Sequence, residues 1–320
     1  EWIQHWGSGW LSLSAYQQQM LFWGLTVWLI RRFTPVVIKR ELGLLLLAVC
    51  GLLFAGCESE PGWRVDMLDI GQGLSVLVTQ GHRALLFDTG DAYPGGYNMA
   101  DAAIFPMLEY RGVQQLDYLV VSHRDKDHAA NWQRINQKYP QAHIVSSAKL
   151  NTETQICQRW QQWDWGQLQL TILSPQNSSG GDINEDSCVL RISDGNHSVL
   201  LTGDVQHQAE SELTNLPAGL LRSDILSSPH HGSRSSSSVA FIAAVAPDYV
   251  VHSAGYQNRW HHPHAEIVAR YIQSQQWITA TDGLISFEIN QNSMDIKPFR
   301  RSQPWYRKMD AWLVGDHPLK

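Results

Sequence analysis

One short stretch of the chain holds an unusual density of side chains that can bind a cation. It reads Ser122-His123-Arg124-Asp125-Lys126-Asp127-His128 and alternates carboxylates with basic residues between two histidines. The stretch follows residues 116–121, an apolar run of strand character. Placing four potential ligands beside a buried strand would be unfavourable in free energy unless a cation binds them. A solvated, charged turn is the alternative interpretation, because short motifs give false positives.

Further potential ligands follow other predicted strands. Asp204 comes after residues 198–202, and His230 and His231 come after residues 225–226. A last group follows residues 249–251 and contains His252, His261, His262 and His264. A lone histidine is usually structural, but ligands brought from several loops to one edge form active sites on α/β scaffolds. The sequence therefore predicts a site at the ends of several strands.

Composition limits the classes of protein to consider. The chain has 320 residues, a net charge of -6 and a pI near 6.1, which excludes a globally basic nucleic-acid binder. The four cysteines form no CxxC pair, so we expect neither a zinc ribbon nor a disulfide framework. Any contact with DNA must then be local or act through metal ions.

The first part of the chain has the pattern of a membrane protein. Two apolar blocks, residues 20–30 and 42–56, flank a loop with four basic residues, and no Lys or Arg occurs in residues 1–30 or 41–63. The positive-inside rule makes that loop cytoplasmic and everything after residue 56 extracytoplasmic. The blocks are shorter than the roughly 20 residues of a spanning helix, so buried core helices are the alternative. Because the chain starts without methionine, we expect the last helical hairpin of a larger membrane protein.

The pattern changes to that of a soluble α/β domain after Trp63. Strand-like runs occur at residues 65–70, 74–78, 83–87, 144–145, 168–173, 188–192 and 198–202. Helices are predicted at 98–112, with a kink at Pro106, and at 129–138. Residues 177–186 read as a loop. Many short strands with a few helices between them indicate sheets covered by helices.

Taken together, these motifs resemble the metallo-β-lactamase-fold hydrolases and, within them, the ComEC-type DNA-uptake proteins of natural competence. The stretches that carry the resemblance are residues 69–73, 87–90, 122–128, 201–204, 229–233 and 253–263. The resemblance implies an α/β fold, an αββα sandwich, over residues 63–297. A two-helix transmembrane hairpin over 1–62 would precede it, and a C-terminal tail over 298–320 would follow.

The same resemblance implies a site for two divalent metal ions. His123 and Asp125 would hold the first ion, and Asp204 would bridge both. The second ion would take Asp127, His128 and one histidine of the pair at 230 and 231. His231 is our choice of ligand, although the sequence leaves this open, and the other histidine could contact a phosphate. The residues expected to act in catalysis are Asp127, His230 and His231, and those expected to orient ligands are Asp88 and His262.

Three departures from the family pattern affect the metal. Leu74 stands where many members carry an acidic residue, and no histidine occurs in residues 184–187, upstream of Asp204. The first ion is therefore expected to be held weakly. Asp125 replaces a histidine that is common elsewhere in the fold, which makes the site richer in oxygen. Manganese is thus favoured, with zinc as the alternative.

The predicted function is a metal-dependent nuclease domain of an inner-membrane DNA-uptake channel, on the periplasmic side, hydrolysing phosphodiesters of incoming DNA. The expected partners are DNA, without sequence specificity, the inner membrane, the remainder of the channel protein and other competence proteins. The residues predicted to grip DNA are Arg124, Lys126, Ser233, Arg234 and Arg259. Two alternatives stay open: a periplasmic metallo-hydrolase of small esters or phosphoesters, and a degenerate domain that only guides DNA.

Overall fold

A computed structural model of the chain describes residues 24–25, 28, 32, 62–176 and 184–300. The chain divides into two compact units, Glu1–Glu60 and Pro61–Lys320, and nearly all described residues belong to the second. The predicted membrane hairpin and the predicted tail lie almost wholly outside the described residues. Within the described ranges, no helix is both long enough and apolar enough to cross a membrane.

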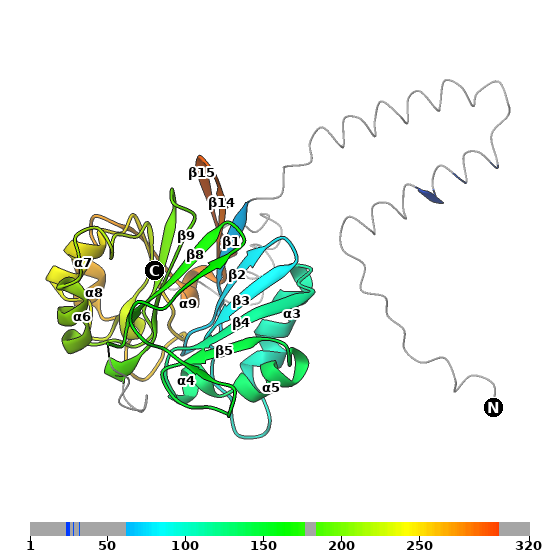
Figure 1. Ribbon diagram of the computed structural model, residues 1–320, viewed down its shortest axis with the longest axis horizontal. Coiled ribbons are helices and arrows are strands. Elements are labelled where there is room, and N and C mark those ends of the chain that lie inside the picture. The colour runs from blue at the N-terminus through cyan, green and yellow to red at the C-terminus, as the bar shows by residue number, and fades with distance from the viewer. Residues whose placement is uncertain (1–23, 26–27, 29–31, 33–61, 177–183, 301–320) are drawn as a thin grey trace, which may run out of the picture. The chain divides into compact units, whose positions relative to one another are not determined.

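Two β-sheets form the centre of the second unit (Figure 1). Within the described residues the first sheet has eight strands, in the order β15 (Ser293–Pro298), β14 (Ile285–Asn290), β1 (Trp63–Met67), β2 (Val76–Gln80), β3 (Arg83–Phe87), β4 (Gln115–Val121), β5 (His143–Ser146) and β6 (Gln155–Ile156). The second has seven described strands, in the order β13 (Gln275–Ile278), β12 (Tyr249–His252), β11 (Ile225–Ser227), β10 (Ser198–Leu201), β9 (Val189–Ser193), β8 (Leu168–Ser174) and β7 (Gln162–Trp165).

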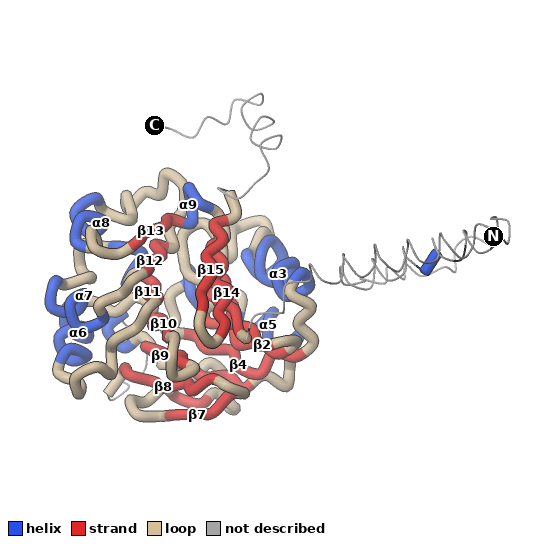
Figure 2. Tube along the Cα trace, turned by 90° about the horizontal axis from the view of Figure 1, so that it is seen from above, coloured by secondary structure: helices blue, strands red, loops and turns tan. Residues whose placement is uncertain are grey.

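Helices cover the outer face of each sheet, as Figure 2 shows from above. The helical segments beside the first sheet are η1 (Ala100–Ile104), α3 (Phe105–Tyr110), α4 (Lys126–Ala129) and α5 (Trp132–Lys138). Those that follow strands of the second are η2 (Asn184–Asp186), α6 (His207–Thr214), η3 (Pro229–Gly232), α7 (Val239–Val245), α8 (Ala265–Arg270) and α9 (Thr279–Asp282). The layers run helix, sheet, sheet, helix.

Alternation along the strands explains these layers. In β2, Val76 and Val78 belong to the apolar cluster between the two sheets, whereas Leu77 faces the cluster under α3 and α5. In β10, Leu200 faces the cluster under α6, α7 and α8, and its two neighbours face the other sheet. Because successive side chains of a strand point to opposite faces, a sheet covered on both sides needs apolar residues at every position. The predicted αββα sandwich is confirmed.

Two predicted helices differ from the observed ones. The helix predicted over 98–112 is split into η1 and α3, and the break falls at Phe105, just before Pro106. Proline lacks the backbone N–H of a helix interior and is tolerated in the first turn. The helix predicted over 129–138 begins only at Trp132, and a separate turn, α4, lies inside the 122–128 motif. That turn brings Asp127 and His128 round towards the sheet edge.

The expectation of no disulfide is wrong for one pair of cysteines. Cys157 and Cys188 form a disulfide with their Cα atoms 5.9 Å apart and a sequence separation of 31. Cys157 follows β6 in the first sheet, and Cys188 precedes β9 in the second. Both are fully buried in the cluster between the sheets. The bond therefore joins the two sheets covalently.

Candidate metal centre

The polar motifs meet at one edge of the sandwich because they all follow strand ends. β4 ends at Val121 and the 122–128 motif follows it. β10 and β11 run parallel, so the loops after them start side by side and carry Asp204, His230 and His231. Loops from both sheets thus contribute side chains to a single cluster, as the spacing of the motifs predicted.

Five side chains form two overlapping groups with the geometry of a metal site. The ligand atoms of His123, His128 and Asp204 all lie within 4.8 Å of one another, and so do those of Asp127, His128 and His231. His128 belongs to both groups. Asp204 also reaches the second group, since its Oδ2 lies 3.5 Å from His231 Nε2. The two groups are therefore one continuous cluster.

Asp88 sets the orientation of both histidines of the motif. Its Oδ2 accepts hydrogen bonds from His128 Nδ1, at 2.8 Å, and from the Ser122 hydroxyl, also at 2.8 Å. Because the Ser122 proton is used in this way, its oxygen can accept from His123 Nδ1, at 2.9 Å. Each histidine then holds its proton on Nδ1 and presents the lone pair of Nε2 to the cluster, the tautomer a metal ligand needs.

Two buried acceptors of the cluster lack a donor within the part of the chain that the structure describes. His123 Nε2 and Asp204 Oδ1 have no hydrogen-bond donor among the described residues. Asp204 Oδ1 faces His128 Nε2 at 3.0 Å. Acceptors that converge in a buried place are unfavourable without a positively charged group among them. Imidazole nitrogens and carboxylate oxygens suit divalent ions of the first transition row, so the donor set fits the metal ions that the motifs predict.

The electrostatics of the cluster also favour a bound cation. Burial favours a higher pKa for Asp204, but His128 and His231 outweigh this and hold its pKa well below the ordinary value. Burial alone would lower the pKa of His231, yet Asp204 and Asp127 raise it to about 9. The carboxylates thus draw positive charge into the site, and a divalent cation could supply it in place of protons.

The structure separates the roles that His230 and His231 can play. Both adopt left-handed backbone conformations, with φ of 49° and 57°, which are rare outside glycine and concentrate at functional sites. The His231 side chain is 3% exposed and belongs to the second group, whereas that of His230 is 21% exposed and belongs to neither. His230 Nδ1 faces the Gln206 amide nitrogen, a donor, at 3.4 Å. His230 Nδ1 also lies 3.2 Å from the Ser235 hydroxyl, and His230 Nε2 lies 3.7 Å from Asp204 Oδ2.

The predicted ligand Asp125 lies next to His123 and outside both groups. Its side chain is 55% exposed and its Oδ2 lies 3.6 Å from His123 Nε2, and it belongs to neither group. Of its neighbours in the motif, Arg124 is exposed, and Lys126 pairs with Asp91 at 3.0 Å. The oxygen-rich ligand set expected from Asp125 stays a prediction.

The remaining predicted residues surround the cluster. The His262 ring centroid lies 5.8 Å from that of His230 and 6.3 Å from that of His231. Burial, followed by the nearby histidines, lowers the pKa of His262 to about 4, so its ring is neutral at physiological pH. Ser233 donates its N–H to the His230 carbonyl. Arg234 pairs with Glu266 at 2.9 Å, so the positive charge of Arg234 is already balanced by a carboxylate.

Sequence reasoning missed two serines of the site. Ser122 precedes the ligand motif directly and connects Asp88 to His123. Ser187 lies in the segment where the family pattern expects a histidine, and its hydroxyl accepts from the Asp204 N–H at 3.2 Å. The position of Ser122 beside the motif could have signalled its part, but nothing in the sequence marks Ser187.

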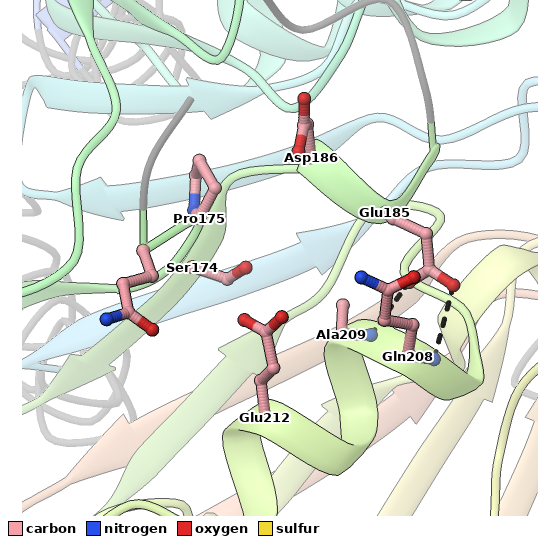
Figure 3. A pocket seen from close by; sticks show the side chains of 8 residues that line it. Ser174, Pro175, Glu185, Asp186, Gln208, Ala209 and Glu212 are labelled. Carbon is pink, nitrogen blue, oxygen red and sulfur yellow. Dashed lines mark hydrogen bonds between the residues drawn. The ribbon is translucent and has the colours of Figure 1, made fainter. Parts of the chain in front are cut away.

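A hollow of about 210 Å³ lies beside the loop that carries Asp204 (Figure 3). It is lined by Ser174, Pro175, Gln176, Glu185, Asp186, Gln208, Ala209 and Glu212. The Glu185 carboxylate accepts from the backbone N–H groups of Gln208 and Ala209, at 3.2 and 2.8 Å, and so caps the start of α6. Glu185 thus stabilises the helix after Asp204, and the hollow contains none of the cluster residues.

Comparison with known proteins agrees with this geometry. Residues 68–255 match the family model of the metallo-β-lactamase superfamily, and this stretch includes β2 to β12 with all five cluster residues. The chain belongs to the metallo-β-lactamase superfamily. Among solved structures, the metallo-β-lactamase fold protein YhfI from Bacillus subtilis is 16% identical, with a TM-score of 0.49, and the match covers 70% of this chain and 99% of YhfI.

Curated relatives include a recombination protein and a competence protein. "Recombination protein 2" of Haemophilus influenzae is 34% identical over 279 residues, which cover 85% of this chain and 35% of that protein. "Competence protein ComA" of Neisseria gonorrhoeae is 35% identical over 282 residues, which cover 85% of this chain and 40% of that protein. The resemblance to ComEC-type proteins is confirmed, and the chain spans about two fifths or less of the length of these relatives.

Proposed function

We propose that this superfamily member is a metal-dependent nuclease domain that hydrolyses incoming DNA during uptake. The observation that carries the proposal is the cluster of His123, Asp127, His128, Asp204 and His231. Two of its buried acceptors, His123 Nε2 and Asp204 Oδ1, have no hydrogen-bond donor among the described residues. The names of the competence relatives supply the DNA context. An acidic chain can act on DNA if bound cations neutralise the phosphate locally.

The chemistry of the proposal divides between the ions and the chain. Two divalent ions, with manganese favoured over zinc, would supply Lewis-acid stabilisation of the charge that develops during phosphodiester hydrolysis. Asp127 is the least buried carboxylate of the cluster, with a side chain 27% exposed, and it can accept a hydrogen bond from the attacking water. The His230 side chain, 21% exposed beside Asp204, could donate a hydrogen bond to a phosphate oxygen. Asp88 keeps the two motif histidines in the ligating tautomer.

The proposed location is the inner membrane, with this domain on the periplasmic side. The basic loop between the two apolar blocks supports this orientation by the positive-inside rule. The Cys157–Cys188 disulfide adds support from a separate observation, because disulfides persist in oxidising compartments such as the bacterial periplasm. The proposed partners are DNA, the membrane, the remainder of the channel protein and other competence proteins.

A cleavage assay tests the proposal. The purified chain should cut DNA when manganese is added, and Asp204→Asn and Asp127→Ala should each lower the rate at saturating DNA by on the order of 10²–10³ or more. Arg124→Ala is the matched control on the same rim. It should weaken DNA binding and reduce its dependence on salt, with the rate of the chemical step nearly unchanged.

Two results would redirect the proposal. Hydrolysis of generic esters or phosphoesters without cutting of DNA would favour a small-molecule hydrolase. A near-normal cleavage rate for Asp204→Asn would place the chemistry outside the cluster.

A further inference from the structure

Exposed aromatic rings lie on two sides of the cluster. The first pair is Tyr93 and Tyr97, in the loop between β3 and η1, where the Tyr93 N–H donates to the Tyr97 carbonyl at 2.7 Å. The two rings are exposed and their centroids lie 5.8 Å apart. The Lys126 ammonium, which pairs with Asp91 at 3.0 Å, also lies 5.6 Å from the centroid of the Tyr93 ring. We call Tyr93, Tyr97 and Lys126 the tyrosine platform.

The second set lies in the loop between β12 and α8. Trp260 is 44% exposed, and the Arg259 guanidinium lies 4.1 Å from the centroid of its ring. The rings of Trp260 and His262 are stacked, with an interplanar angle of 20° and centroids 6.4 Å apart. His262 is stacked in the same way on His231, at 29° and 6.3 Å. We call Arg259, Trp260 and His262 the tryptophan platform.

The two platforms flank the second ligand group. Lys126 precedes Asp127 in the chain, and His262 stacks on His231, while Asp127 and His231 lie 3.5 Å apart. The tyrosine platform follows a strand of the first sheet and the tryptophan platform follows a strand of the second. Between their sheets, the Ser253 hydroxyl donates to the Gly73 carbonyl at 2.7 Å and ties the two edges together. The two platforms therefore start from different sheets of the sandwich.

We propose that these platforms stack the unpaired bases of a single nucleic-acid strand and so favour single-stranded over duplex DNA at the cluster. This inference rests on the proposed nuclease function and specifies the form of its substrate. Aromatic rings beside cationic groups bind single strands without sequence preference, since every base has a π-face. In a duplex those faces are covered by neighbouring bases, so the rings can engage only unstacked ones.

The pairing of ring and cation selects this ligand over other stacking ligands. Neutral sugars also lie against aromatic rings, but they gain nothing from Lys126 or Arg259. A strand of nucleic acid alternates planar bases with anionic phosphates and uses both parts of each platform. The guanidinium over Trp260 can itself stack a base on its outer face, because Arg planes pair with bases in this way.

Equilibrium binding without cleavage tests the inference. The purified chain in EDTA is titrated against three labelled ligands of roughly 12 nucleotides, a length within the range of single-strand sites. They are a single strand, the blunt duplex of the same sequence, and an abasic strand that keeps the phosphates and lacks the bases. The single strand should bind at least 5-fold more tightly than either of the other two.

Substitutions assign the preference to the platforms. Tyr93→Leu and Trp260→Leu should each weaken binding of the base-bearing strand by roughly 5- to 100-fold and leave the abasic strand unchanged. Tyr110→Leu is the matched control. Its ring is 77% exposed and lies under the Arg111 guanidinium at 5.4 Å, but it precedes β4, whose far end carries the cluster. This change should leave all three affinities unaltered, and melting temperatures establish that each variant is folded.

The outcomes separate this inference from the function on which it rests. A chain that still cuts DNA could bind base-bearing and abasic strands equally, or prefer the duplex. Either result would overturn the proposed role of the platforms and leave the nuclease proposal intact. Normal single-strand binding by both platform variants would also overturn them. If the chain neither binds nor cuts any form of DNA, the nuclease proposal itself fails and the platforms fail with it.

Discussion

At the scale of single residues, one buried carboxylate controls the chemistry of two histidines. Asp88 is fully buried and has a left-handed backbone, with φ of 60°, an uncommon conformation for a non-glycine residue. That conformation lets its side chain reach Ser122 and His128 together. Ordinary packing would not need a strained, charged residue here, which supports a role in holding ligands.

The first prediction follows from the tautomers that Asp88 enforces. In Asp88→Asn the amide N–H would face donors from Ser122 and His128, so the proton of His128 should move to Nε2. We expect manganese affinity to fall by 10- to 100-fold, as for other partners of ligating histidines. Calorimetric titration with manganese measures this. Asp101→Asn, an exposed carboxylate paired with Arg134, is the control and should bind manganese normally. Unchanged affinity in Asp88→Asn would mean that the histidines are oriented by packing alone.

At the scale of elements, tight backbone approach fixes the motif loop against the sheet. Gly73 has φ of +125°, and a Cβ added there would lie 2.3 Å from the Asp127 carbonyl oxygen. The same carbonyl accepts from the Leu74 N–H at 3.2 Å. Asp127 and His128 lie on the α4 turn. Because Gly73 has no side chain, the backbone of that turn can approach the loop after β1 closely.

The second prediction uses two glycines that share a left-handed backbone. Gly73→Ala should push the α4 turn outward and weaken manganese binding by at least 10-fold, since both ligand groups include His128. Gly81→Ala, with φ of +55° and nothing within 4 Å, should cost only about 1–2 kcal/mol of backbone strain and leave the metal affinity unchanged. Thermal unfolding and metal titration of both variants measure the two effects. Equal metal affinity in the two variants would contradict the proposal that Gly73 positions the α4 turn.

The third prediction concerns the disulfide between the sheets. Closing 31 positions of chain with Cys157–Cys188 should stabilise the domain by on the order of 3–4 kcal/mol, chiefly by restricting the unfolded chain. Denaturant unfolding with and without reductant measures this difference. The double variant Cys157→Ala, Cys188→Ala should be less stable and indifferent to reductant, which controls for other effects of the reagent. Equal stability of the oxidised and reduced wild-type chain would remove this role of the bond.

The sequence predicted elements and their ends better than it predicted pairings between them. The strand over 83–87 and the placement of Asp204 and His231 after strands follow from alternation and turn residues, which are local signals. The disulfide could not be predicted, because Cys157 and Cys188 meet only when two sheets stack. The choice between His230 and His231 also needed the fold, since their chemical types are identical and only the backbone separates them.

At the scale of the whole molecule, the net charge and the site must be reconciled with an anionic substrate. The chain carries a net charge of -6. Asp88, Asp127 and Asp204 all lie in or beside the cluster. Without cations such a site would repel phosphate. Bound ions would make the cluster compatible with a phosphate, while the two platforms would bind DNA outside the cluster, so cleavage should depend on divalent ions more than on the total charge.

The last prediction concerns the orientation of the whole chain in the membrane. The basic loop between residues 30 and 41 is proposed to face the cytoplasm, and the disulfide-bonded domain to face the periplasm. A reporter enzyme that is active only outside the cytoplasm should work when fused after Lys320 and fail when fused at Pro35. Immunoblots of both fusions control for expression. The opposite pattern would place the domain in the cytoplasm, where incoming DNA would reach it only after crossing the membrane, and where the Cys157–Cys188 bond would be kept reduced.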